Sequence, residues 1–141
     1  MGARRLGRER ALQALYQLEN DAKLGSQGAL DAAWTAHDDE GPRDPAADEF
    51  ARELIAGVQA NLVDIDKVIE EHSHNWRLDR MQRIDRNVLR IGVFELKHLK
   101  DIPRKVTINE AVELGKTFGN EASSAFINGL LDKVAEGVDK P

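Results

Sequence analysis

The chain has 141 residues, a net charge of −5 at neutral pH and no cysteine. This length suits one domain that can bury a sizeable core without disulfide bonds. A sequence without cysteine excludes disulfides, thiolate nucleophiles and thiolate metal ligands, and no apolar run approaches the roughly 20 residues of a membrane span. We therefore expect one soluble, cytoplasmic domain over residues 1–141.

The charge is segregated along the chain. Residues 1–10 hold four arginines against one glutamate, and residues 77–105 hold nine bases against four acids. Residues 19–53 instead hold ten acids against three bases. Two basic blocks in an acidic protein leave a polyanionic partner open, with ordinary solvated charge as the alternative.

Residues 3–19 are predicted to form the first helix, with Leu12, Leu15 and Leu18 as its apolar edge. A helix start carries positive partial charge, so each cation there is unfavourable by roughly 0.3–1 kcal/mol. Four arginines crowd this start: Arg4, Arg5, Arg8 and Arg10. Their cost to the fold favours a binding role for this basic N-terminal arm, residues 1–10, and a frayed, solvated terminus is the alternative.

Residues 20–45 form a polar and acidic connection with a short predicted helix around 29–36, which carries Trp34. We expect this connection to be the most mobile part of the domain and to carry no chemistry. Asp44-Pro45 then marks a helix start, with the aspartate as N-cap and the proline in the first turn. Apolar residues recur every three or four positions from 50 to 69, which predicts one helix of about 25 residues.

Residues 75–78 break this pattern, and we expect Trp76 and Met81 to fill the core beneath a short turn. The next segment, Ile84–Leu99, has apolar side chains almost all round a helix, which is typical of a helix enclosed by others. Its cations are spaced so that they share one side, which predicts a basic stripe open to solvent. The stripe consists of Arg83, Arg86, Arg90 and Lys97.

The segment Thr107–Glu110 has the pattern of a capping box, and Gly119 is expected to close the short helix that follows it. A last helix is predicted from about residue 123 to 137. No strand-type alternation occurs in the sequence. The predicted fold is all-α, a compact single-domain bundle of about seven helices around a buried central helix.

Three sequence features imitate catalytic or metal sites. Gly115-Lys116-Thr117 resembles the end of a P-loop, but the first glycine and the preceding strand are missing. His72 and His74 fall on different sides of a helix and lack the glutamates of a di-iron bundle. Glu95 is a conceivable catalytic carboxylate, although a structural salt bridge or helix-end hydrogen bond is favoured. We expect no catalytic residue, metal or cofactor.

A binding surface remains as the favoured use of the charged residues. Single-stranded nucleic acid is held by cations that follow its phosphates and by aromatic rings that stack on its bases. Tyr16 and Phe118 are rings that could pair with the arginine block. Periodicity alone leaves both of them equally well explained as core residues.

Four stretches of the chain resemble the NusB family of transcription antitermination proteins. They are ARRLGRERALQALY at 3–16, ELIAGVQAN at 53–61, RIDRNVLRIGVFEL at 83–96 and IPRKVTINEAVELGKTFGNEASSAFINGLLDK at 102–133. The resemblance implies a NusB-like helical fold without catalysis, which binds the single-stranded boxA segment of ribosomal RNA leader transcripts. It also implies pairing with NusE, a small-subunit ribosomal protein, within the antitermination complex of RNA polymerase and other Nus factors.

The resemblance also implies roles for individual residues. The implied RNA surface comprises Arg4, Arg5, Arg8, Arg10, Tyr16, Lys116, Phe118, Gly119, Ser123 and Phe126. The implied NusE face comprises Asp79, Arg83, Asp85, Arg86 and Arg90, which turns the basic stripe into a partner surface. Two positions depart from some relatives, because Leu6 interrupts a longer arginine run and Ala122 replaces an aspartate. Some family members self-associate, so a homodimer of the free protein is left open.

Three other functions fit parts of the sequence. A purely protein-binding helical adaptor would use the same charges without RNA affinity. An enzyme is a second alternative, because NusB-like domains precede methyltransferase domains in some RNA-modifying proteins, but it would need another chain. Helix-turn-helix DNA binding needs a basic recognition helix, whereas the last predicted helix is acidic.

Overall fold

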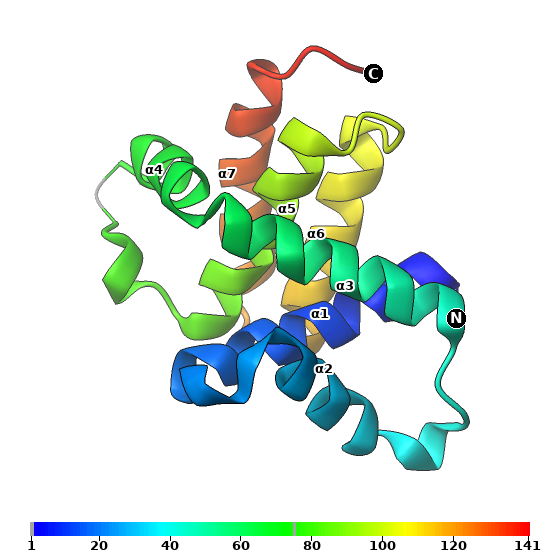
Figure 1. The fold of residues 1–141 in the computed structure, drawn as a ribbon. Coiled ribbons are helices and arrows are strands. Elements are labelled where there is room, and N and C mark those ends of the chain that lie inside the picture. Colours follow the sequence, from blue (N-terminus) through cyan, green and yellow to red (C-terminus); the bar gives the residue numbers. More distant parts are fainter. Residues whose placement is uncertain (1, 75) are drawn as a thin grey trace. The chain divides into compact units, whose positions relative to one another are not determined.

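The structure, a computed structural model, describes residues 2–74 and 76–141 (Figure 1). Within these ranges the regular elements are helices, and no strand occurs among them. The helices are α1 (Ala3–Asn20), α2 (Gly25–Thr35), α3 (Pro45–Ala60), α4 (Leu62–His72), α5 (Arg83–His98), α6 (Arg104–Phe118) and α7 (Ser123–Glu136). Three short 3-10 turns accompany them: η1 (Ala22–Leu24), η2 (Asp38–Glu40) and η3 (Leu78–Arg80). The predicted all-α class is confirmed.

The chain forms two compact units, residues 1–59 and 60–141. In the first unit, α1 packs along α2 (Figure 1). Leu12 and Leu30 are fully buried there. Gly7 allows α1 to approach α3 closely, because a Cβ at this position would lie 2.8 Å from the carbonyl oxygen of Ala47.

The second unit is built around α5, as predicted. This helix packs against α4, α6 and α7, and α6 and α7 also pack against each other (Figure 1). Ten of its residues are buried, from Asp85 to Leu96. Gly92 brings α5 close to α7, because a Cβ there would lie 2.8 Å from Leu131 Cδ1.

The predicted 25-residue helix is in fact two helices, α3 and α4, which are separated at Asn61. The backbone of Asn61 has φ −116° and ψ 20°, outside the α-helical region. Asparagine is a poor helix former because its side chain competes for backbone hydrogen bonds. The apolar spacing continues through the break, which explains why periodicity predicted one helix. The start at Asp44 is confirmed, since its carboxylate accepts from the backbone N–H of Ala46 at 3.0 Å.

The predicted capping box at Thr107 is wrong. Helix α6 begins at Arg104, so Thr107 lies inside the helix, where its side chain is 1% exposed. Its hydroxyl donates a hydrogen bond of 2.8 Å to Glu95 Oε1. Glu95 is equally enclosed, at 1% exposed, and a buried carboxylate requires such a donor. Glu95 thus has a structural hydrogen bond, made by a residue inside α6 and not at a helix end.

The two residues expected to fill the core after α4 behave differently. Met81 is 6% exposed and is buried as predicted. Trp76 is 56% exposed, so the prediction that it fills the core is wrong. Trp76 precedes η3 outside the regular helices, where no periodicity says which side chains turn inward.

The acidic connection over residues 20–45 contains more structure than the short helix predicted at 29–36. Trp34 is 8% exposed, and its indole N–H donates a hydrogen bond of 2.9 Å to Asp48 Oδ1. The Arg43 guanidinium also donates to Asp48 Oδ1 and lies 5.6 Å from the Trp34 ring. These contacts tie the connection to α3. Its mobility stays a prediction.

Candidate nucleic-acid interface

The four arginines of α1 divide into two exposed and two enclosed side chains. Arg4 and Arg5 are exposed. Arg8 is 3% exposed and Arg10 is 2% exposed. Only the first pair therefore presents its charge to solvent over most of the side chain.

The ring of Phe50, on α3, packs against arginine side chains at the beginning of α1. The guanidinium carbons of Arg4 and Arg8 lie 5.4 and 5.3 Å from its ring centroid. Both distances are within cation–π range, and Gly7 provides the close approach that brings the ring between these two arginines. Phe50 thus positions the cations without cancelling their charge.

Arg10 has a different environment inside the first unit. Its guanidinium lies 5.0 Å from the Trp34 ring, and Nη2 donates a hydrogen bond of 2.9 Å to Glu40 Oε2. Because Glu40 neutralises it and the side chain is enclosed, Arg10 links α1 to α2 and η2. It was predicted as an RNA contact, and the structure gives it a packing role that sequence alone did not reveal.

Tyr16, also on α1, is half-buried.

Glu9 lies among the arginines, and its burial raises the pKa of its carboxyl above the usual 4.5. The charge of Glu40 adds to this shift, whereas Arg10, Arg5 and His37 oppose it. The arginine-rich start of α1 is thus partly shielded from water.

The remaining predicted RNA residues gather at the turn between α6 and α7. Lys116 is exposed, and its ammonium lies 3.6 Å from Glu113. Phe118 and Phe126 are half-buried, so each offers part of a ring to solvent. One cation and two rings thus lie on the helix ends that flank this turn.

Gly119 and Ser123, predicted as RNA contacts, shape this turn. Ser123 is fully buried, and its hydroxyl accepts from the backbone N–H of Asn120 at 3.0 Å. A Cβ on Gly119 would lie 2.6 Å from Ser123 Cβ and 2.8 Å from the carbonyl oxygen of Gly115. The backbone of Gly119 has φ −95°, which any residue can adopt, so its conformation does not require glycine. The lack of space for a Cβ does. Gly119 does mark the end of α6 as predicted, but its backbone is extended and is not that of the C′ glycine that was expected there.

The basic stripe of α5 is mostly engaged inside the second unit, so its prediction as a solvent-open row is wrong. The Arg90 side chain is 11% exposed and donates from Nε and Nη2 to the two carboxylate oxygens of Asp66, at 2.8 and 3.0 Å. Arg86 Nη1 donates to the backbone carbonyls of Leu78 and Met81, at 3.0 and 3.2 Å. Lys97 is the exposed member of the stripe.

The other residues of the implied NusE face differ in exposure. Asp79 is exposed and lies 3.4 Å from Arg77. Arg83 is half-buried, and Asp85 is 7% exposed. This face therefore combines an exposed acid, Asp79, with Arg86, which the backbone around η3 holds, and Arg90, which Asp66 holds.

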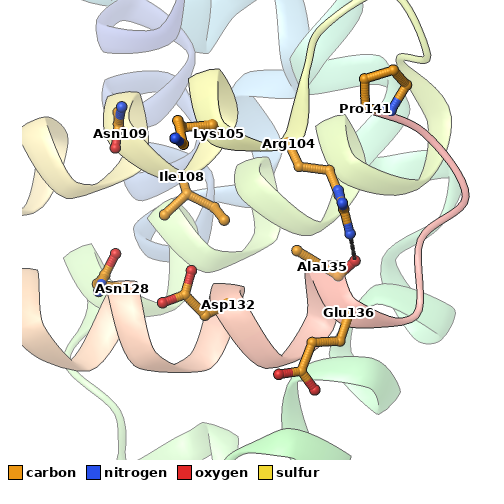
Figure 2. A pocket seen from close by; sticks show the side chains of 9 residues that line it. All are labelled: Arg104, Lys105, Ile108, Asn109, Asn128, Asp132, Ala135, Glu136 and Pro141. Atoms are coloured by element: carbon orange, nitrogen blue, oxygen red, sulfur yellow. Dashed lines mark hydrogen bonds between the residues drawn. The ribbon is translucent and has the colours of Figure 1, made fainter.

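A hollow of about 610 Å³ lies beside α6 and α7 (Figure 2). Arg104 crosses its edge and donates a hydrogen bond of 2.8 Å to the carbonyl oxygen of Ala135. The charges that line it are mixed, because Lys105 is accompanied by Asp132 and Glu136. This mixture does not favour a polyanion.

Metal sites and membrane-spanning helices are absent from residues 2–74 and 76–141. In that part of the chain, no group of three or more histidine or acidic side chains is placed to hold a metal ion. No helix in it combines the length and the apolar character that crossing a membrane requires.

The described chain is an all-helical protein with exposed arginines at the start of one helix and half-buried rings beside a turn between two others, and cations and rings are the side chains that nucleic-acid-binding proteins use. Known proteins agree with this class. Residues 5–136 match the model of the NusB family. The chain is 67% identical over 141 residues to the transcription antitermination protein NusB of Myxococcus xanthus (strain DK1622), with 100% of both chains covered. This protein belongs to the NusB family, whose members are transcription regulators and not enzymes.

Solved structures support the same assignment. NusB of T. maritima matches with a TM-score of 0.85 and 37% identity, over 98% of this chain and 93% of that one. A crystal structure of antitermination factors NusB and NusE in complex with double-stranded RNA matches with a TM-score of 0.81 and 25% identity. That match covers 95% of this chain and 96% of the other. The fold predicted from the family resemblance is confirmed.

Proposed function

We propose that this protein binds a boxA-type single-stranded RNA of ribosomal RNA leader transcripts and helps RNA polymerase to read through terminators. The observation that carries this proposal is the exposed pair Arg4 and Arg5 at the start of α1, where cations are unfavourable for the helix. A polyanion next to them would offset this cost. A relative that was solved with NusE and double-stranded RNA supports NusE and RNA as partner classes. We place this activity in the cytoplasm.

The RNA contacts divide by chemistry. Arg4 and Arg5 neutralise phosphates, with Arg8 beside them over the Phe50 ring. Lys116 adds a cation, and Phe118 and Phe126 stack on bases, each stack contributing roughly 1–3 kcal/mol. Tyr16 adds a further half-exposed ring. Arg10, Gly119 and Ser123 act through the fold that they maintain.

NusE is the proposed protein partner and binds around η3 and the start of α5. Asp79 and Arg83 offer the accessible charges of this face. Arg86 and Arg90 hold the face in place through their bonds to Leu78, Met81 and Asp66. Pairing with NusE would then place the protein among the other Nus factors. Self-association of the free protein stays a prediction.

A salt series of RNA mobility shifts tests the proposal. Each phosphate neutralised on a single strand contributes roughly −0.7 to the slope of log affinity against log salt. The double substitution Arg4→Ala and Arg5→Ala should therefore flatten the slope by about 1.4 and leave the helical content unchanged. Lys23→Ala, another exposed cation of the first unit, should change neither. An unaltered slope in the double variant would exclude these arginines from RNA binding.

The same series should use single-stranded and double-stranded boxA-type RNA, each with and without NusE. We expect the single strand to bind more tightly, because its bases are free to stack on the phenylalanines. A purely protein-binding adaptor is the alternative. It predicts NusE binding that depends on Asp79, with no RNA shift at physiological salt.

A further inference from the structure

Another hollow, of about 390 Å³, lies within the second unit, between the segment that leads into α5 and the turn between α6 and α7. Its volume is within the range of about 300–1,000 Å³ that is usual for ligand pockets. It is lined by Trp76, Arg80, Met81, Gln82, Asp85, Asn120, Ala122 and Phe126. Trp76, Arg80 and Asp85 lie outside the RNA residues that the family resemblance implies.

Trp76 is the first sign that this hollow has a ligand. Its side chain is 56% exposed, although tryptophan is among the most costly side chains to leave in water. Met81, 6% exposed, and the half-buried Phe126 provide the other apolar surfaces. A flat aromatic ligand would cover the indole and restore the hydrophobic packing that it lacks.

Asp85 is the second and independent sign. It is 7% exposed, and no residue within 2–74 or 76–141 donates a hydrogen bond to its buried Oδ1. Buried polar atoms without a partner are rare in native proteins and call for an explanation. A carboxylate accepts hydrogen bonds and donates none when ionised, so the missing partner is an N–H or O–H donor.

We propose that the hollow takes one unstacked base of the bound RNA, and that this base carries an exocyclic amino group. Trp76 stacks on the base, and Asp85 accepts from the amino group, as carboxylates do from cytosine N4. Arg80, an exposed cation of the same lining, pairs with a phosphate of the strand. The proposal rests on the RNA binding proposed above and assigns Asp85 to the RNA instead of NusE.

A nucleic-acid occupant fits this lining better than a protein side chain. The lining joins an aromatic face, a hydrogen-bond acceptor and a cation, which correspond to the ring, the amino group and the phosphate of one nucleotide. Its far side is formed by Asn120, Ala122 and Phe126, at the turn that carries the aromatic RNA contacts. A tyrosine of a partner protein would use the acceptor and the ring but not the cation.

The test combines Trp76→Ala with RNAs in which each nucleotide in turn is made abasic. Loss of one stacked base is worth roughly 5- to 150-fold in affinity, so Trp76→Ala should weaken intact boxA-type RNA by about ten-fold or more. Trp76→Phe should retain most of the affinity. At one position, and only there, the abasic RNA should bind wild type and Trp76→Ala equally. Asp85→Asn should weaken RNAs with cytosine or adenine at that position more than RNAs with uracil.

A fluorescence titration gives a second readout that does not depend on affinity. In a Trp34→Phe variant, Trp76 is the sole tryptophan, and stacking of a base should quench its emission when RNA is added. The RNA affinity of Trp34→Phe is measured beside that of wild type, because Trp34 packs on Arg10 of the helix that carries Arg4 and Arg5. Thermal unfolding of each variant verifies the fold, and the exposed Trp76 should be replaceable without loss of stability.

Several outcomes would overturn the base-binding proposal. An equal loss of affinity for every abasic RNA, or no loss at all, would show that no base occupies the hollow. Weakened NusE binding with unchanged RNA binding would assign the hollow to a protein side chain. If wild type binds no RNA, the proposed function falls with it. If RNA binding depends on Arg4 and Arg5 but not on Trp76, only the base pocket is rejected.

Discussion

The two arginine-rich segments of this protein look alike in sequence and differ in what surrounds their charges. On α1, Arg4 and Arg8 lie over a neutral ring, Phe50. On α5, Arg90 makes two hydrogen bonds to the carboxylate of Asp66. An aromatic face attracts a cation without cancelling its charge, whereas a carboxylate neutralises it. The Phe50 contact itself therefore leaves the charges of Arg4 and Arg8 in place, whereas the Asp66 contact offsets the charge of Arg90.

Arg10 is the exception on α1, because Glu40 neutralises it, and its replacement should have the largest effect on stability. Arg10→Ala should lower the free energy of unfolding by about 2–3 kcal/mol, since it removes an enclosed side chain together with its interactions with Trp34 and Glu40. Denaturant unfolding measures this change. Arg5→Ala on the exposed side should cost less than about 0.5 kcal/mol. Equal costs would contradict the division of α1 into structural and binding arginines.

Arg90 provides the corresponding test on α5. Arg90→Ala should destabilise the protein by about 2 kcal/mol, because Asp66 would then lose both donors in a partly enclosed site. Asp66→Asn should cost less, since the amide still accepts one hydrogen bond. Thermal unfolding gives both values, and RNA affinity should be unchanged when the variants are folded. A loss of RNA affinity without loss of stability would mean that Arg90 binds the polyanion directly.

Phe50→Leu tests whether the ring positions the cations of α1. The substitution keeps apolar volume and removes the π face, so each of the two cation–π interactions, with Arg4 and with Arg8, should account for a destabilisation of about 0.5–1 kcal/mol. We also expect RNA affinity to fall a few-fold with an unchanged salt slope, because the charges remain but are held less firmly. Phe50→Tyr keeps the ring and is the matched control. If Phe50→Leu instead flattens the slope of log affinity against log salt, the arginines no longer reach the phosphates when the ring is absent, and the ring is required for the phosphate contacts.

The sequence predicted the helices well because their apolar period depends on local spacing. It predicted the surroundings of single residues less well, because these depend on distant partners. The residues next to Arg10 in the sequence do not indicate its hydrogen bond to Glu40, and those next to Thr107 do not indicate its hydrogen bond to Glu95. Trp76 was assigned to the core from its residue type, and only coordinates show that it is exposed.

The candidate interface shows the same limit. The resemblance implies a set of residues, but it does not separate the exposed ones from those that shape the backbone. Ser123 and Gly119 are constrained by the turn that they form, and Arg10 by its burial. Helical spacing gives no information on such constraints, because each arises where chain segments from different elements meet. One signal was available for Trp76, since it stands in a break between helices.

Glu9 gives the smallest expected effect and measures how far the arginine-rich start of α1 is shielded. Its carboxyl has a pKa above the usual 4.5, chiefly because of burial, so the folded state binds the proton more tightly than the unfolded state does. The stability due to this proton is present below pH 4.5 and is lost as the pH rises through the folded pKa. Glu9→Gln should therefore be slightly more stable than wild type at neutral pH, by less than about 0.5 kcal/mol, and the difference should vanish in acid. Glu53→Gln, on the exposed side of α3, should show no such pH dependence. A wild type that is more stable than Glu9→Gln at neutral pH would mean that the attraction of Arg5 and Arg10 outweighs burial, and that the start of α1 is less shielded than its surroundings suggest.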